Sequence, residues 1–136
     1  MKIVLDTNCL IVSLPLTSPY HCIWQAFREG KITFCCSTDI INEYDEVLSR
    51  FYPQRFVKDV INELLLSFNV IKVNNYYKWH LITIDPDDNK FVDCALNIGA
   101  DCIVTNDKDF NVLKNIAFPK VNVVDIASFK KVIAII

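Results

Sequence analysis

Glycine is almost absent from this chain, which has only two in 136 residues. A P-loop and a dinucleotide-binding fold both need several glycines where the backbone approaches a phosphate, so the sequence argues against both. No apolar run is long enough to span a bilayer, and the start lacks the charged, apolar and small-residue segments of a signal peptide. From these absences we expect a soluble cytoplasmic protein with no membrane partner.

The pattern of a zinc site is missing as well. The two histidines, His21 and His80, fall at no zinc-type spacing beside the cysteines, and no C-x-x-C pair occurs. Cys35 and Cys36 are adjacent in a strand-like run, where neighbouring side chains point to opposite faces and cannot easily form a disulfide. We therefore expect all six cysteines to be free thiols that pack as small apolar side chains in a reducing compartment.

The charge of the chain gives no strong indication of a partner. The formal net charge is −2, which neither requires nor excludes nucleic acid. A polyanion would need local lysines or metal ions to offset the carboxylates. The length fits a single domain over residues 1–136, with one hydrophobic core.

Short apolar runs alternate with helical patterns along the chain. The expected strands are 3–5, 32–36, 70–73, 103–105 and 121–124, and the expected helices are 18–30, 38–51, 56–68, 87–99 and 128–136. Apolar strands separated by helices are typical of a parallel sheet covered on both faces. The sequence therefore predicts an α/β fold, a three-layer α/β/α sandwich around a parallel sheet of about five strands. Such sheets bind ligands beyond the carboxyl ends of their strands.

Four acids are expected at that edge of the sheet. Asp6 ends the first strand and Asp107 follows the fourth. In the helix 38–51, Glu43 lies on the flank of the apolar stripe, where an unpaired carboxylate is unfavourable. Asp88 shares a face with apolar residues at the start of its helix, so it too is drawn inward.

Carboxylates gathered in one place repel one another, and their pKa values rise. Mg²⁺ or Mn²⁺ removes this conflict, because hard cations prefer oxygen ligands and retain room for waters and a substrate phosphate. Such a metal activates water for attack on phosphorus, and a second metal can stabilise the leaving oxygen. Thr105 and Asn8 are neutral groups suited to orienting the ligands by hydrogen bonds. Together these residues indicate a metal site for phosphodiester chemistry.

Three segments carry a family resemblance: VLDTNCLI, STDIINEYDEVL and DPDDNKFVDCALNIGADCIVTNDKDF. In this order they span essentially the whole chain, which resembles the PIN domain and, within it, the VapC-like ribonuclease toxins of bacterial toxin–antitoxin systems. The resemblance implies an endoribonuclease that needs Mg²⁺ or Mn²⁺ and hydrolyses single-stranded or loop RNA. It also implies an antitoxin partner and a homodimer. The matching acids are Asp6, Glu43, Asp88 and Asp107, and the small polar residues beside them are Thr7, Asn8 and Thr105.

The third acid has competitors. The aspartates in this region are Asp85, Asp87, Asp88 and Asp93. Asp88 is preferred because it faces inward and because its distance to Gly99 fits the helix of the family. Asp93 is the reserve, although its face also fits a solvated side of the helix, and Asp87 fits a helix cap.

Further residues lie close to these acids in the sequence. Asp109, two residues after Asp107, is a second reserve ligand. Lys90 and Lys108 flank two of the acids and are candidates for contacts with RNA phosphates, although they fit ordinary surface lysines equally well.

Other functions fit the sequence less well. A phosphatase of the haloacid dehalogenase type needs an aspartate where this chain has Asn8, and a response-regulator receiver needs an aspartate after the strand 70–73. A structure-specific DNA nuclease would use the same metal chemistry, but this short chain offers no obvious clamp for duplex ends. The alternative that stays open is a catalytically silent PIN module that binds RNA or a partner protein. A missing acid would indicate that module, and all four are present.

Overall fold

A parallel sheet forms the centre of the protein. The computed structural model describes residues 1–74 and 77–136. In these residues five strands lie in the order β3-β2-β1-β4-β5. The strands are β1 Lys2–Leu5, β2 Thr33–Ser37, β3 Val70–Val73, β4 Cys102–Val104 and β5 Val123–Val124. The chain builds outward from β1 to β3 on one side and then continues with β4 on the other side. The topological switch point therefore lies between β1 and β4.

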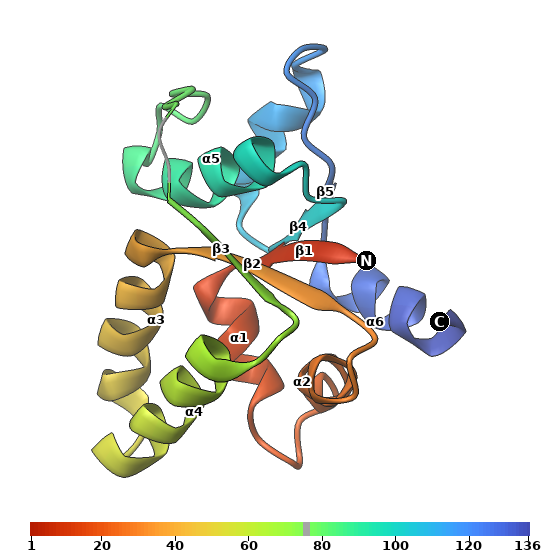
Figure 1. Cartoon of the computed structure of the whole chain (residues 1–136). Helices are drawn as coiled ribbons and strands as arrows, with labels where there is room; N and C mark the ends of the chain where they lie inside the picture. Colours follow the sequence, from red (N-terminus) through yellow and green to blue (C-terminus); the bar gives the residue numbers. More distant parts are fainter. Residues whose placement is uncertain (75–76) are drawn as a thin grey trace.

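Helices cover both faces of this sheet (Figure 1). The helices are α1 Thr7–Ser13, α2 His21–Arg28, α3 Thr38–Phe51, α4 Gln54–Leu66, α5 Asn89–Ile98 and α6 Ile126–Ile135, with 3₁₀ segments η1 Pro86–Asp88 and η2 Lys108–Asn115. In Figure 1, α5 lies above the sheet and α1 to α4 lie below it. The contacts agree, because α5 packs against four of the strands and α6 packs beside α2. The predicted α/β sandwich with a five-stranded parallel sheet is confirmed.

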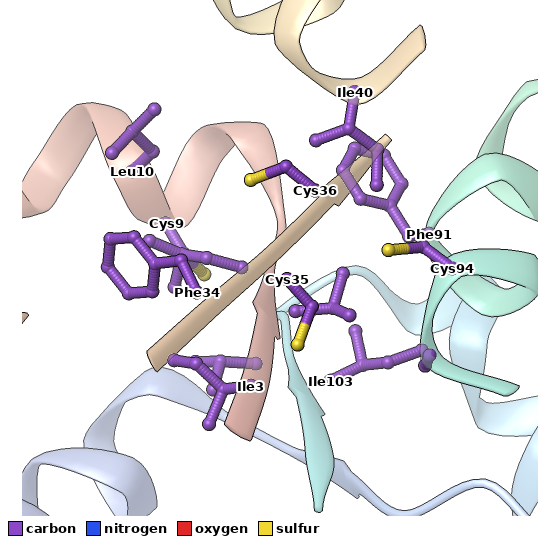
Figure 2. Close-up of a cluster of buried hydrophobic side chains, with 14 of the residues drawn as sticks. Ile3, Cys9, Leu10, Phe34, Cys35, Cys36, Ile40, Phe91, Cys94 and Ile103 are labelled. Atoms are coloured by element: carbon purple, nitrogen blue, oxygen red, sulfur yellow. The ribbon is translucent and has the colours of Figure 1, made fainter. Parts of the chain in front are cut away.

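The core fills both faces of β2. Phe34 stacks on Phe27 of α2 with their ring centroids 4.4 Å apart. Figure 2 shows Cys35 and Cys36 pointing away from each other, with Phe91 and Cys94 reaching in from α5. All six cysteines are free, as predicted. Burial raises the pKa of the Cys35 thiol to about 11, so this side chain stays neutral and packs as an apolar group.

Several boundaries differ from those expected. The expected helices omit α1 and η2, which begin one residue after Asp6 and Asp107. α1 has no side-chain cap, since Asp6 makes no cap hydrogen bond, so the usual start signal is missing. The last helix begins at residue 126 and not at 128, because Asp125 Oδ1 accepts a hydrogen bond from the Ser128 N–H at 2.7 Å. Within residues 1–74 and 77–136, no helix has the length and apolar character that crossing a membrane requires.

Candidate functional site

The ends of two neighbouring strands bring Asp6 and Asp107 to one edge of the sheet. Leu5 of β1 pairs with Val104 of β4, and the Asp6 N–H donates to the Val104 carbonyl at 3.0 Å. Thr105 joins the two acids through one hydroxyl. Its Oγ1 donates to Asp6 Oδ2 at 2.7 Å and accepts the Asp107 N–H at 3.0 Å. The sequence placed these residues together because parallel strands end at the same edge, and the structure agrees.

Asp6 is held in a poorly solvated position. Asp6 is only 8% exposed, and this burial raises the pKa of its carboxyl group above the usual value. The hydrogen bonds from Thr105 and from the Thr7 backbone lower that pKa, while the charges of Asp107 and Glu43 raise it further. A nearby cation would stabilise the ionised form of Asp6.

Glu43 reaches the site from α3. Both of its oxygens are engaged, because Oε2 accepts a hydrogen bond from the Thr7 hydroxyl and Oε1 lies 2.7 Å from Lys90 Nζ. Lys90 Nζ also lies 3.1 Å from Asp87 Oδ1. The Tyr44 hydroxyl donates to the backbone carbonyl of Leu5, which ties α3 to the end of β1. Glu43 is therefore fixed from both sides.

Asp88 is the carboxylate with the least support. It is half-buried, and its Oδ2 is buried without a hydrogen-bond partner among the described residues. Burial, followed by the charges of Asp107, Asp85, Asp6 and Asp109, raises the pKa of Asp88 from 3.8 to about 7. Oxygens of Asp85, Asp88 and Asp109 lie within 4.8 Å of one another. An unpartnered oxygen in an all-oxygen donor set fits a hard divalent cation.

Asp93, the reserve for the third acid, lies in different surroundings. It is 8% exposed, and its Oδ1 accepts the Trp79 N–H at 3.0 Å. Burial raises the pKa of Asp93, and the nearby charges of His80 and Lys78 lower it. The expectation of a solvated side chain is wrong for Asp93. The charges that act on Asp93 are therefore basic, whereas those that act on Asp88 come from other acids.

Asp93 belongs to a polar stripe on α5 that holds the segment 77–82. Asn89 accepts the Ile82 N–H at 2.9 Å and donates to the Ile82 carbonyl at 2.8 Å. Asn97 donates to the Tyr77 carbonyl at 3.3 Å. The three side chains lie four residues apart and so share one face of the helix. They hold the backbone of the segment 77–82 against α5.

The remaining residues that the sequence suggests for the site are exposed to solvent. Asp107 caps η2, since its Oδ1 accepts the Asp109 N–H at 2.9 Å. Lys108 is exposed, and Asn8 is exposed in the first turn of α1. Asp87 does not cap the helix as expected, because Asp85 caps η1 and Asp87 pairs with Lys90.

Sequence reasoning missed two features of this site. Asp85 joins Asp88 and Asp109, whereas in the sequence it is only one of several neighbouring aspartates. Lys90 pairs with Glu43 across 47 positions of the chain. In the sequence, helical period indicates only which side chains face the core. It does not indicate which residues of two different helices come into contact.

A groove of about 670 Å³ opens beside Glu43, and Asp6, Asp88 and Asp107 are not part of its lining. It runs between α3 and the start of α5, and its lining includes Asn42, Glu43, Arg50, Lys78 and Lys90. Carboxylates and basic side chains are both present along it.

Comparisons with known proteins agree on the fold. A sequence model of the PIN domain matches residues 2–109. A crystal structure of VapBC2 from Rickettsia felis bound to a DNA fragment from their promoter superposes with a TM-score of 0.64 at 16% identity, over 92% of this chain and 98% of that chain. VapBC-1 from nontypeable Haemophilus influenzae gives 0.62 at 16% identity, over 93% and 99%. FitAcB from Neisseria gonorrhoeae gives 0.55 at 14% identity, over 92% and 98%. No curated protein sequence matches this chain.

Proposed function

This chain belongs to the PIN domain family, and on that basis we propose that it is a single-domain, Mg²⁺- or Mn²⁺-dependent endoribonuclease. Its substrate would be single-stranded or loop RNA, cleaved by hydrolysis of a phosphodiester bond. The proposed acids of the site are Asp6, Glu43, Asp88 and Asp107, with Asp109 as a reserve ligand.

The observation that carries this proposal is the unpartnered carboxylate oxygen of Asp88. Leaving a buried carboxylate oxygen without a donor is unfavourable, and proteins keep such groups where a ligand completes them. The charges of Asp6, Asp107, Asp85 and Asp109 surround Asp88 and make the metal-free site still less favourable. Asp88 would therefore hold the cation together with neighbouring acids, of which Asp85 and Asp109 have oxygens within 4.8 Å of its own and Asp6 and Asp107 act on it through their charges.

The residues of the chain itself would orient the reaction. Thr105 fixes the Asp6 carboxylate and the start of the Asp107 turn through one hydroxyl. Thr7 and Lys90 fix Glu43. When bound, Mg²⁺ or Mn²⁺ would supply charge stabilisation at the phosphate and activation of water. Lys108, which is exposed beside Asp107, would contact a backbone phosphate of the RNA.

The structural neighbours support a role for this chain as the toxin of a toxin–antitoxin pair. VapBC and FitAB are complexes of this kind, and the VapBC2 structure contains a bound DNA fragment from their promoter. We expect a cognate antitoxin, a homodimer, and a cytoplasmic location where RNA is available. Exposed apolar side chains of α4 and its following turn, such as Leu66 at 83% and Phe68 at 92% exposed, offer surface for such contacts.

The test is a cleavage assay on a mixed single-stranded RNA. It compares the wild type with Asp6→Asn, each in Mn²⁺ and in EDTA. Asp59→Asn, which changes an exposed acid of α4, is the matched control. We expect cleavage by the wild type and by Asp59→Asn in Mn²⁺, and none from Asp6→Asn or in EDTA.

Full activity of folded Asp6→Asn would contradict the catalytic assignment. No cleavage by folded wild type under any condition would instead favour the catalytically silent module that binds RNA or a partner protein.

A further inference from the structure

Lys90 lies between two carboxylates at the rim of the acidic site. Its Nζ is 2.7 Å from Glu43 Oε1 and 3.1 Å from Asp87 Oδ1. The side chains of Lys90 and Glu43 are only 17% and 20% exposed, whereas those of the surface pair Arg50 and Glu46 are 63% and 69% exposed. A shielded ion pair is hard to separate, because the charge that stays behind is left desolvated and unpaired.

Glu43 and Asp88 differ in what their oxygens bind. Each oxygen of Glu43 already has a partner, Lys90 on Oε1 and the Thr7 hydroxyl on Oε2. Asp88 Oδ2 has none among the described residues. A divalent cation that took Glu43 would have to displace the Lys90 ammonium, whereas one that took Asp88 would satisfy an oxygen that lacks a partner.

The other acids of the site also differ in which charges act on them. The Asp107 charge acts on Asp6 more strongly than the Glu43 charge does. The charges that act on Asp88 come from Asp107, Asp85, Asp6 and Asp109. The acids therefore form two groups. Glu43 and Asp87 are neutralised by Lys90, whereas the carboxylates around Asp88 repel one another.

Resting on the proposed metal-dependent function, we propose that Lys90 is a built-in cation of this site. Its ammonium group holds Glu43 and Asp87 out of the ligand set, so the protein binds one divalent cation, through Asp88 and the acids whose charges surround it. Lys90 takes the place that a second divalent cation would need. Glu43 is then a positioning residue, which acts through Lys90 and Thr7.

The experiment counts bound Mn²⁺ without RNA, by calorimetric titration and by electron paramagnetic resonance of the free ion. The wild type is expected to bind one Mn²⁺ per chain. Lys90→Met exposes Glu43 to the cation and is expected to bind two, and Lys90→Met/Glu43→Gln is expected to return to one. Lys90→Arg keeps the charge, and Lys108→Met removes a charge elsewhere beside the acids, so both are expected to bind one.

Any of three results would overturn the inference. The wild type binds two Mn²⁺, Lys90→Met binds one with unchanged affinity, or Lys108→Met binds two. Melting in EDTA confirms that every variant folds, and Lys90→Gln replaces Lys90→Met if that variant does not. A wild type that binds no Mn²⁺ contradicts the metal dependence of the proposed function, and a Lys90→Met variant that also binds none overturns the inference too. The expected counts without RNA cleavage would contradict only the nuclease function.

Discussion

Replacing Asp88 by asparagine is expected to stabilise the metal-free protein at high pH and to leave it unchanged at low pH. The pKa of Asp88 rises from 3.8 to about 7 on folding, first through burial and then through the neighbouring acids. Between these two values the unfolded chain loses the proton while the folded protein keeps it. The free energy of unfolding therefore falls as the pH rises through this window, and the whole penalty is present above pH 7.

The size of this penalty follows from the shift. A rise of about three pKa units corresponds to roughly 4 kcal/mol as an upper bound. Asp88 is only half-buried, so solvent screening reduces the expected effect to about 1–2 kcal/mol. For a domain of this size, that free energy corresponds to a melting temperature about 4–8 °C higher in Asp88→Asn.

The measurement is thermal unfolding in EDTA at pH 8 and at pH 4, for the wild type, Asp88→Asn and Asp59→Asn. The last variant changes an exposed acid of α4 and should melt with the wild type at both pH values. An equal gain for Asp88→Asn at both pH values would show that its effect is not electrostatic. No gain at pH 8 would refute the argument that this carboxylate is held at an unfavourable site.

Three further outcomes are expected. Added millimolar Mn²⁺ should raise the melting temperature of the wild type through preferential binding to the folded state, and this rise should be lost in Asp88→Asn; an unchanged wild-type melt would argue against a preformed site. Thr105→Val removes the hydroxyl that orients Asp6, so calorimetry should show Mn²⁺ affinity about 10–100-fold weaker; wild-type affinity would contradict this orienting role. Asp93→Ala leaves the backbone N–H of Trp79 without its acceptor, so chemical denaturation should show a free energy of unfolding lower by about 1–3 kcal/mol, while the affinity for Mn²⁺ is retained. A loss of Mn²⁺ affinity in this variant would instead identify Asp93 as a ligand.

The elements with clear local signals agree with the sequence prediction. The helix α3 has the predicted bounds, and Ser37 Oγ caps it by accepting the Ile40 N–H at 3.2 Å. β3 also has the predicted bounds. Where such signals are absent, prediction fails. α1 has only seven residues and no side-chain cap, so its apolar residues could not be distinguished from a loop or a continuing strand.

The sequence by itself determined that Asp6 and Asp107 would share one edge of the sheet. Parallel strands separated by helices all end on the same side, so the position of an acid after its strand is sufficient. The inward turn of Glu43 also followed from helical period, which is a local property of its helix. Asp88 is half-buried as well, although it ends the 3₁₀ segment η1 and lies just before α5.

Only the tertiary structure decided how these acids are neutralised. The pairing of Lys90 with Glu43 joins α5 to α3 across the end of the sheet, and no local pattern encodes that distance. The same holds for Asp93. Helical period indicates which face of α5 it occupies, but its partner, the backbone N–H of Trp79, depends on how the segment 77–82 folds back. Helical period and strand order determine where a side chain points. Which charge it meets there depends on the packing of separate elements, and that packing leaves Asp88 with the unpartnered oxygen.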